Sequence, residues 1–405
     1  MTRRSIDHDA PAKAAGNRTV LRFNSSELAG SLGDLGTFLP LATALAVVCR
    51  MDLGPIFIFA GIMHIASGWL FRQPIPVQPM KAIAATGIAE GLFPSEIAAA
   101  GIIMGVLVLA LSITGLVDTI VRYIPRSVVR GIQVGIGLKL ALKAIAWVSG
   151  VNPIEWQWDE PLPMWGADSL LVAALAVGLV CWPRLRQWPV MLITFVAGLA
   201  LAGVGRPSVF QDLQLQPPTF TLLLPSPDAW LTGLWRGALP QLPLTLLNSV
   251  VAVCALSADL YPGRSVAPRR VASSVGLMNL IAVPFGGMPM CHGSGGLAAQ
   301  HRFGARTGGS VIMLGAIKIV AGLLFGAGLV PLLQTYPRAI LAVMLFFAGL
   351  TLAWPVRDSL NGLPMAIVSA TVIGILFGNT AVGTLCGLVV LGVYRGVQRL
   401  RGSSA

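Results

Sequence analysis

Long apolar runs separated by short polar segments recur along the chain from Leu28 almost to the C-terminus. An α-helix needs about 20 apolar residues to cross the hydrocarbon core of a bilayer. The pattern therefore predicts an all-α polytopic membrane protein with about fourteen transmembrane segments, seven on each side of a polar, Pro-rich loop. We predict these segments at residues 28–49, 54–72, 77–91, 96–118, 126–147, 166–183, 188–205, 235–257, 268–285, 290–302, 309–330, 336–353, 361–378 and 380–397.

The third and tenth segments are too short and too rich in glycine and proline to be ordinary spans. In PIPVQPMKA, the prolines at 74, 76 and 79 prevent regular helix up to Pro79, because proline lacks an amide hydrogen and restricts the residue before it. Extended chain that leads into a helix near Pro79 is the expected structure. PFGGMPM followed by CHGSGGLAAQHRF has the same order. We therefore predict two strand-plus-half-helix segments that meet at mid-membrane.

The two halves of the chain are related in sequence. Each has its broken segment in third place, and each opens on a similar stretch, GDLGTFLPLATAL in the first and LPQLPLTLLNSV in the second. Because seven is odd, the halves have opposite orientations, and interrupted segments in inverted repeats indicate the binding site of a secondary transporter. The predicted parts are a cytoplasmic tail, a first repeat, an external loop, a second repeat and a cytoplasmic tail, at 1–27, 28–205, 206–234, 235–397 and 398–405.

Composition and charge agree with a membrane protein. Only 11% of residues are charged and 55% are hydrophobic, whereas soluble domains carry roughly 25% charged residues. The net charge of +12 would indicate nucleic acid in a soluble protein. With the N-terminus in the cytoplasm, however, most basic residues fall in cytoplasmic segments, and the external ones are Arg50, Arg206, Arg236 and Arg338. This positive-inside pattern predicts a multi-pass protein of the cell inner membrane, embedded in lipid, with no nucleic-acid partner.

The two half-helix starts carry the chemistry of an anion site. A helix N-terminus offers unpaired N–H groups and about half a positive charge, and two that converge favour an anion. Neither start carries Asp or Glu, which a cation or nucleobase carrier would be expected to place there. The candidate groups are the positive charge of Lys81, a donor on His292 or Ser294, and backbone exposed at Gly293, Gly295 and Gly296.

Each of these candidates has a structural alternative. The glycines can serve tight helix packing, and His292 can be an interior histidine that is hydrogen-bonded and never touches substrate. Lys81 is disfavoured at a helix N-terminus, so it must pair with an acid, reach water or meet an anion. HGSGG is not a nucleophile elbow, since His292 stands where Gly-x-Ser-x-Gly needs its first glycine. No metal cluster or nucleotide-binding loop is present in the sequence, so we expect neither an enzyme nor a cofactor.

Polar residues inside other spans are further candidates, because burying them in lipid is costly. Asp34, beside Thr37 in the first span, is either a coupling-proton site or a partner of Lys81 or of a half-helix terminus. One face of the eighth span is polar, facing either the cavity or a neighbouring helix; its residues are Gln241, Thr245 and Asn248. We assign no function to the intramembrane lysines Lys139, Lys143 and Lys318.

Four motifs in this order resemble the molybdate transporter family, a branch related to the sulfate permeases: GSLGDLGTFLPL, PVQPMKAIAA, LPQLPLTLLNSVVAV and MPMCHGSGGLAAQHRFGARTGG. The resemblance implies a seven-plus-seven inverted repeat like that of uracil permease, with core and gate domains. It also implies molybdate uptake, with sulfate or tungstate as competitors. By position it adds Gln78, Pro79, Met80 and Cys291 to the substrate-binding candidates, and it supports Lys81, His292, Gly293, Ser294, Gly295, Asp34, Thr37, Gln241, Thr245 and Asn248.

One feature separates the chain from the wider sulfate permeases. Those proteins usually carry an anti-sigma-antagonist-like domain after the last span, and here the sequence ends shortly after Arg401.

Taken together, the broken segments and the four motifs predict a secondary transporter that imports molybdate by alternating access. A sulfate carrier of the same fold and an anion channel are the alternatives, and a homodimer stays open. Proton coupling is a hypothesis based on Asp34 and His292.

Overall fold

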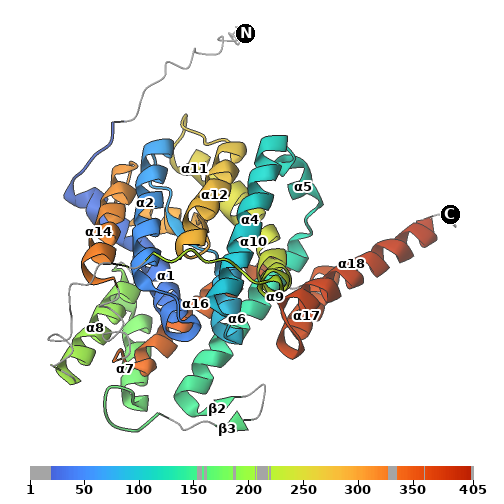
Figure 1. The fold of residues 1–405 in the computed structure, drawn as a ribbon. Coiled ribbons are helices and arrows are strands. Elements are labelled where there is room, and N and C mark those ends of the chain that lie inside the picture. The colour runs from blue at the N-terminus through green and yellow to red at the C-terminus, as the bar shows by residue number, and fades with distance from the viewer. Residues whose placement is uncertain are drawn as a thin grey trace, which may run out of the picture.

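The computed structural model describes residues 20–152, 157–158, 162–185, 188–205, 207, 218, 220–326, 335–359 and 361–402. These residues form a helical bundle with two short antiparallel strand pairs, from which the last helix projects (Figure 1). Most of the predicted N-terminal tail, much of the first half of the predicted loop 206–234 and residues 403–405 lie outside the described part.

The first half of the chain supplies seven predicted segments in the expected order. Its elements are α1 (Ser25–Cys49), α2 (Leu53–Phe71), β1 (Val77–Pro79), α3 (Lys81–Glu90), α4 (Pro94–Thr114), α5 (Val117–Tyr123), α6 (Arg126–Ser149), β2 (Val151–Asn152), β3 (Gln157–Trp158), α7 (Leu170–Cys181), a 3₁₀ turn η1 (Pro183–Leu185) and α8 (Val190–Gly205). The short helix α5 is separate from α4, because Gly115 ends α4 in the left-handed conformation.

The second half repeats this order. Its first span combines α9 (Pro227–Thr232), the π-helical η3 (Gly233–Ala238), α10 (Leu239–Leu244), the π-helical η4 (Thr245–Val251) and α11 (Ala252–Leu260). The rest comprises α12 (Pro268–Ala282), η5 (Val283–Phe285), β4 (Met290–His292), α13 (Ser294–Arg302), α14 (Gly309–Phe325), α16 (Arg338–Ala353), η6 (Trp354–Ser359), α17 (Gly362–Phe377) and α18 (Thr380–Gly402).

The eighth span begins earlier than its apolar pattern indicates. Its helix starts at Pro227, inside the segment assigned to the external loop. The cause is local: Ser226 caps the helix by accepting a hydrogen bond from the Ala229 N–H at 3.3 Å, and proline suits the first helical position. In the described part of the chain, seven helices are long and apolar enough to span a membrane, and four apolar helices are shorter.

Contacts between helices follow the inverted repeat. α2 of the first half packs along α14 of the second, and the corresponding helices α12 and α4 pack together in the same way. The two strands that correspond, β1 and β4, pair with each other. Exchanging the halves therefore leaves these contacts unchanged, as expected for two copies related by a pseudo-two-fold axis.

Glycines allow these paired helices to touch through their backbones. A Cβ added at Gly61 of α2 would lie 2.5 Å from the carbonyl oxygen of Gly315 on α14, and one added at Gly68 would lie 2.4 Å from the Gly308 oxygen. Small residues serve this purpose in membrane helices, since lipid offers no hydrophobic force to press the helices together. The close packing on α14 holds α2 in place, and α2 in turn contacts β1.

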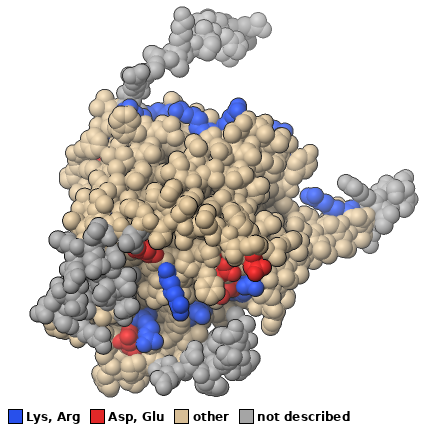
Figure 2. Space-filling view, viewed as in Figure 1, with Lys and Arg blue, Asp and Glu red and all other residues tan. Residues whose placement is uncertain are grey.

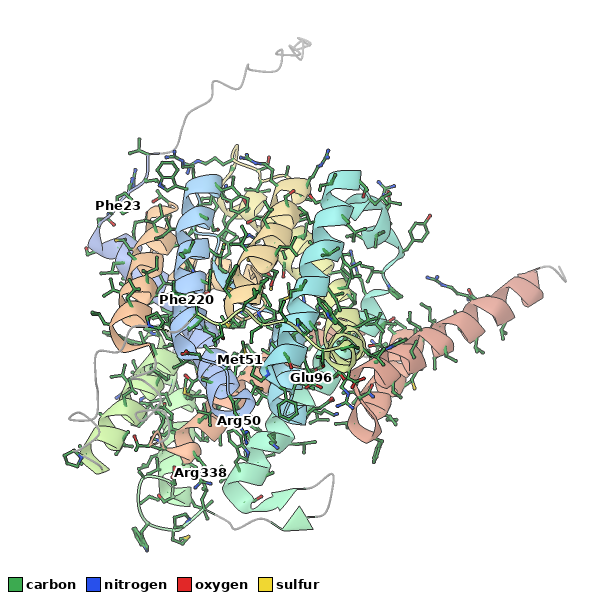
Figure 3. The ribbon with its side chains drawn as sticks, in the orientation of Figure 1. Phe23, Arg50, Met51, Glu96, Phe220 and Arg338 are labelled. Carbon is green, nitrogen blue, oxygen red and sulfur yellow. The ribbon has the colours of Figure 1, made fainter. Side chains whose placement is uncertain are left out.

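Charge is concentrated at the two ends of the bundle. Figure 2 shows Lys and Arg along the upper edge, a mixed group of basic and acidic residues in the lower half, and a broad uncharged band between them. In Figure 3, Phe23 lies near the upper end, and Arg50 and Arg338 lie in the lower half. An uncharged belt between charged ends is the surface that a bilayer requires.

The two broken segments meet as predicted, with strands first and half-helices after them. β1 and β4 are antiparallel, with Gln78 opposite Cys291. The Met80 N–H extends the pairing by donating to the Pro289 carbonyl oxygen at 2.8 Å. Buried Asn279 of α12 binds both the N–H and the carbonyl oxygen of Met290. Since the strands are antiparallel, α3 and α13 leave opposite ends of the short strand pair and run in opposite directions.

Candidate anion-binding site

A cavity of about 210 Å³ lies where the two half-helices begin, and we call it the central cavity. Its walls come from β1 and α3, from β4 and α13, from the eighth span, and from α6, α16 and η6. Both halves of the chain thus contribute. The lining residues are Gln78, Lys81, Gln133, Gln241, Leu244, Asn248, Ser249, Cys291, His292, Gly293, Ser294, Gly295, Thr351, Leu352 and Pro355.

A second cavity of about 250 Å³ adjoins the first and contains Thr37, so we call it the Thr37 cavity. It shares Lys81, Thr351 and Leu352 with the central cavity. Its other walls come from α1, α6, α8 and α16. Lys81 therefore stands at the junction between the two cavities.

Lys81 has no acidic partner there. It is half-buried, and in the described part of the chain no carboxylate lies within ion-pair distance of it. A cation at a helix N-terminus must pair with an acid, reach water or meet an anion. Because no acid among these residues pairs with Lys81, its charge must be met by what fills the two cavities. A cation without a counterion, facing a cavity lined by polar side chains, favours an anion there.

The two half-helix N-termini differ in whether a side chain already accepts hydrogen bonds from their N–H groups. At α3, the N–H groups of Ala82 and Ile83 donate to Gln241 Oε1 at 2.8 and 3.3 Å, and Gln241 Nε2 donates to Thr245 at 2.9 Å. Gln241 is thus a helix cap supplied by the eighth span. At α13, Gly293 is the N-cap and gives no side-chain cap. The sequence predicted that both termini converge on one site, and the structure leaves the α13 terminus as the more open one.

The glycines before α13 have different roles. A Cβ at Gly293 would lie 1.9 Å from Gln78 Oε1, and one at Gly296 would lie 2.3 Å from Gln78 Nε2, so the Gln78 amide occupies the space that side chains would fill. At Gly295, a Cβ would have no heavy atom within 4 Å. Gly295 is therefore the glycine that faces open space, next to half-buried Ser294.

The Gln78 amide is held in one orientation. Its Nε2 donates to Asp34 Oδ1 at 2.6 Å, and turning the amide over would place two acceptor oxygens together. Its Oε1 has no hydrogen-bond partner among the described residues, although a buried acceptor without a donor costs about 1–3 kcal/mol. Gln78 thus connects the wall of the central cavity to Asp34, which is fully buried.

His292 is engaged on both ring nitrogens. Nδ1 lies 3.0 Å from the Pro76 carbonyl oxygen and Nε2 lies 3.1 Å from Ser274 Oγ, while the ring meets Phe71 edge to face. Nδ1 must carry the hydrogen that faces the carbonyl, so Nε2 accepts from the serine. Although His292 lines the cavity, neither nitrogen is free for substrate, which favours the structural alternative.

The remaining predicted residues take separate places. Cys291 and Asn248 line the central cavity and Thr37 lines the second one. Pro79 and Met80 are buried in the strand and its extension and line neither cavity.

Asp34 does not meet Lys81 as an ion-pair partner. Its Oδ2 lies 3.2 Å from His64 Nε2 and 3.9 Å from Lys318 Nζ. Sequence reasoning missed His64, although a histidine in the apolar run FAGIMHIASG is a detectable signal.

The central cavity shares a lining residue with a further cavity. Asn248 also lines a cavity of about 570 Å³ that contains Arg126, Arg130 and Arg395. Arg130 Nη1 donates to Gln133 Oε1 at 3.0 Å, and Gln133 lines the central cavity. A different cavity of about 660 Å³, around Glu90, Lys139 and Arg236, shares no lining residue with the central one.

The inverted halves, the broken segments and the polar cavity between them define a multi-pass membrane transporter, not an enzyme. The model of the molybdate transporter family, described as "Molybdate transporter of MFS superfamily", matches residues 26–140 and 233–352. The chain belongs to this family.

Relatives in plants and algae agree. Molybdate transporter 2 of Arabidopsis thaliana is 40% identical over 406 residues, covering 90% of this chain and 86% of the relative. Molybdate transporter 1 of Chlamydomonas reinhardtii is 34% identical over 486 residues, covering 93% and 92%.

Solved structures show the same fold at low sequence identity. The transmembrane domain of a cyanobacterial bicarbonate transporter, BicA, is similar with a TM-score of 0.64 at 18% identity, covering 89% of this chain and 96% of that one. Murine Solute Carrier 26 family member A9 in its inward-facing state gives 0.69 at 14% identity, covering 94% and 69%. The expected sulfate-permease-like fold is confirmed.

Proposed function

We propose that this chain imports molybdate across the cell inner membrane by alternating access, with both termini in the cytoplasm. One observation carries the proposal: Lys81, a cation without an acidic partner in the described residues, faces a polar cavity beside the open N-terminus of α13. A tetrahedral oxyanion would be held by Lys81, by Ser294 and by backbone N–H groups next to Gly295. The names of the relatives support molybdate as the oxyanion.

Two bodies would move relative to each other during transport. The cavities lie between a core, made of the broken segments with α1, α2, α4 and the eighth to eleventh spans, and a gate that includes α6, α8 and α16. In this division the repeats run from 28 to 205 and from 235 to 397. The central cavity and the Arg130 cavity share Asn248 as a wall, which supports a route toward the side where basic residues gather. Release to the cytoplasm would follow this route.

The test is uptake of labelled molybdate by purified protein in liposomes, with sulfate as competitor. We expect saturable uptake that accumulates molybdate above equilibrium when a driving gradient is present, and weaker inhibition by sulfate than by unlabelled molybdate. Sulfate inhibition as strong as that of molybdate would favour a sulfate carrier of the same fold. Uptake that never exceeds equilibrium would favour an anion channel. Size measurement in detergent would decide whether the transporter is a homodimer.

Replacing Lys81 with methionine is expected to weaken molybdate binding about 10- to 100-fold, because a charge-assisted interaction of about 1.5–3 kcal/mol is lost. Methionine keeps the length of the side chain and removes its charge. The matched control is Lys143→Met, which removes a lysine charge from α6 at the separate Glu90 cavity. Equal molybdate affinities of the two variants in isothermal titration calorimetry would refute the placement of the anion beside Lys81.

A further inference from the structure

Three titratable side chains are sealed behind the anion site and take no part in lining it. Asp34 of α1, His64 of α2 and Lys318 of α14 are each at most 1% exposed. His64 Nε2 and Lys318 Nζ lie 3.2 and 3.9 Å from Asp34 Oδ2. Ionisable groups at this depth are costly and mark ion or proton pathways in membrane proteins.

The geometry places a proton between Asp34 and His64. His64 Nδ1 lies 2.7 Å from the Ala60 carbonyl oxygen, so this nitrogen must carry a hydrogen. His64 Nε2 then faces Asp34 Oδ2, and both atoms would be acceptors unless one of them is protonated. An imidazolium beside a carboxylate and an imidazole beside a carboxylic acid both satisfy this contact, and the second form also lets Nε2 accept from the Val77 N–H. In either case the pair holds one ionisable proton.

A second arrangement of the same groups is available without this proton. The Val77 N–H points at His64 Nε2 from 3.3 Å, and it can use the nitrogen lone pair fully once the proton has left. The carboxylate of Asp34 then keeps the Gln78 bond and gains Lys318 as its counterion. Lys318 Nζ has no hydrogen-bond partner among the described residues. It lies 3.2 Å from the Phe38 ring centroid and, at 3.9 Å, already within ion-pair distance of Asp34 Oδ2.

Both Val77 and Gln78 belong to β1, the strand that leads into α3. Loss or gain of the proton therefore changes the hydrogen bonds of the strand that positions the half-helix at the central cavity. The pair is thereby connected to the anion site by neighbouring residues of one element.

The charges favour joint binding of proton and anion. With the proton, the three side chains sum to one positive charge, and without it they sum to zero. Positive charge behind Gln78 attracts an anion in the cavity, and this attraction is reciprocal. The other titratable groups facing the pair are Lys81 from α3, which acts on Asp34, and His292 from β4, which acts on His64.

We propose that Asp34 and His64 form the binding site of a proton that crosses the membrane together with the anion, with Lys318 as the counterion of Asp34 after the proton leaves. The proton is taken from water on the side where the anion enters and returned to water on the other side. This inference rests on the proposed anion transport and assigns its coupling site to His64, in place of His292.

The experiment uses liposomes containing the full chain and labelled molybdate. Accumulation is measured with an imposed inward proton gradient, and exchange of internal against external molybdate is measured without one. We expect His64→Gln to reduce gradient-driven accumulation at least tenfold while exchange stays detectable. The matched control is His301→Gln, a histidine of α13 that lines neither cavity at the site; it should behave as the unchanged protein. Equal accumulation in both variants would overturn the proposal.

A measurement on the unchanged protein covers the case in which His64→Gln does not fold. Molybdate is added to the purified protein in weakly buffered solution, and we expect proton uptake of about one per bound anion. Molybdate binding without any proton uptake refutes the proton site and leaves the proposed transport function standing. Absence of molybdate binding and exchange in the unchanged protein would instead refute the proposed function.

Discussion

Gly293→Ala is expected to lower molybdate uptake about 10- to 100-fold, although it adds only one methyl group. The new Cβ would lie 1.9 Å from Gln78 Oε1. Gln78 cannot give way easily, because its other amide atom is bound to Asp34 at 2.6 Å and lies against Gly296. Breaking a buried hydrogen bond to a charged group costs about 1.5–3 kcal/mol, which corresponds to this loss. Initial rates of uptake into liposomes measure the effect.

The neighbouring glycine provides the control. Gly295→Ala places its Cβ where no heavy atom of the protein lies within 4 Å, so the helix start accepts it. Its effect on uptake is limited to contact of the methyl group with the anion and should be several-fold smaller than that of Gly293→Ala. Gly295→Trp, in contrast, fills the same open space with a large ring and should block uptake. If Gly295→Ala proves as damaging as Gly293→Ala, the central cavity does not have the shape described above.

Gly315→Leu is expected to have the largest effect on stability. A Cβ at this position would lie 2.5 Å from the Gly61 carbonyl oxygen and 3.0 Å from His64 Cβ. The obstacle is backbone, so α2 and α14 must separate. Overpacking a core costs about 1–3 kcal/mol and occasionally more. We expect poor yield and a lower unfolding temperature in detergent, measured by loss of the monodisperse peak after heating.

The control is Gly178→Leu on α7, an exposed glycine whose Cβ would have no neighbour within 4 Å. The same chemical change should be tolerated there, because the side chain points away from the bundle. A Gly315→Leu variant as stable as Gly178→Leu would mean that α2 and α14 are not in backbone contact.

Much of the architecture was predictable because it depends on local properties of the chain. The positions of the spans follow from the length of apolar runs, and the broken segments follow from prolines such as Pro76 and Pro79. The meeting of the two broken segments was predicted from their equal positions in two inverted halves, and the structure adds that their strands β1 and β4 pair. Gly295, Ser294 and Lys81 were likewise identifiable, because they directly follow the helix breakers.

The details of the site were not predictable, because they depend on which side chains from distant spans face each other. The sequence named Gln241 as polar but did not reveal that it caps α3. It offered Lys81 as a partner for Asp34, whereas α2 and α14 bring His64 and Lys318 to it. Gly293 and Gly295 are alike in sequence, and only the position of the Gln78 amide separates them.

The sequence by itself determined the membrane fold, its inverted halves and the place of the candidate anion site, because hydropathy and helix breaking act within a few neighbouring residues. Only the tertiary structure decided which half-helix terminus is open and which groups surround the buried carboxylate of Asp34. The rotation of each helix about its axis fixes those contacts, and that rotation is set by packing against helices from the other half of the chain.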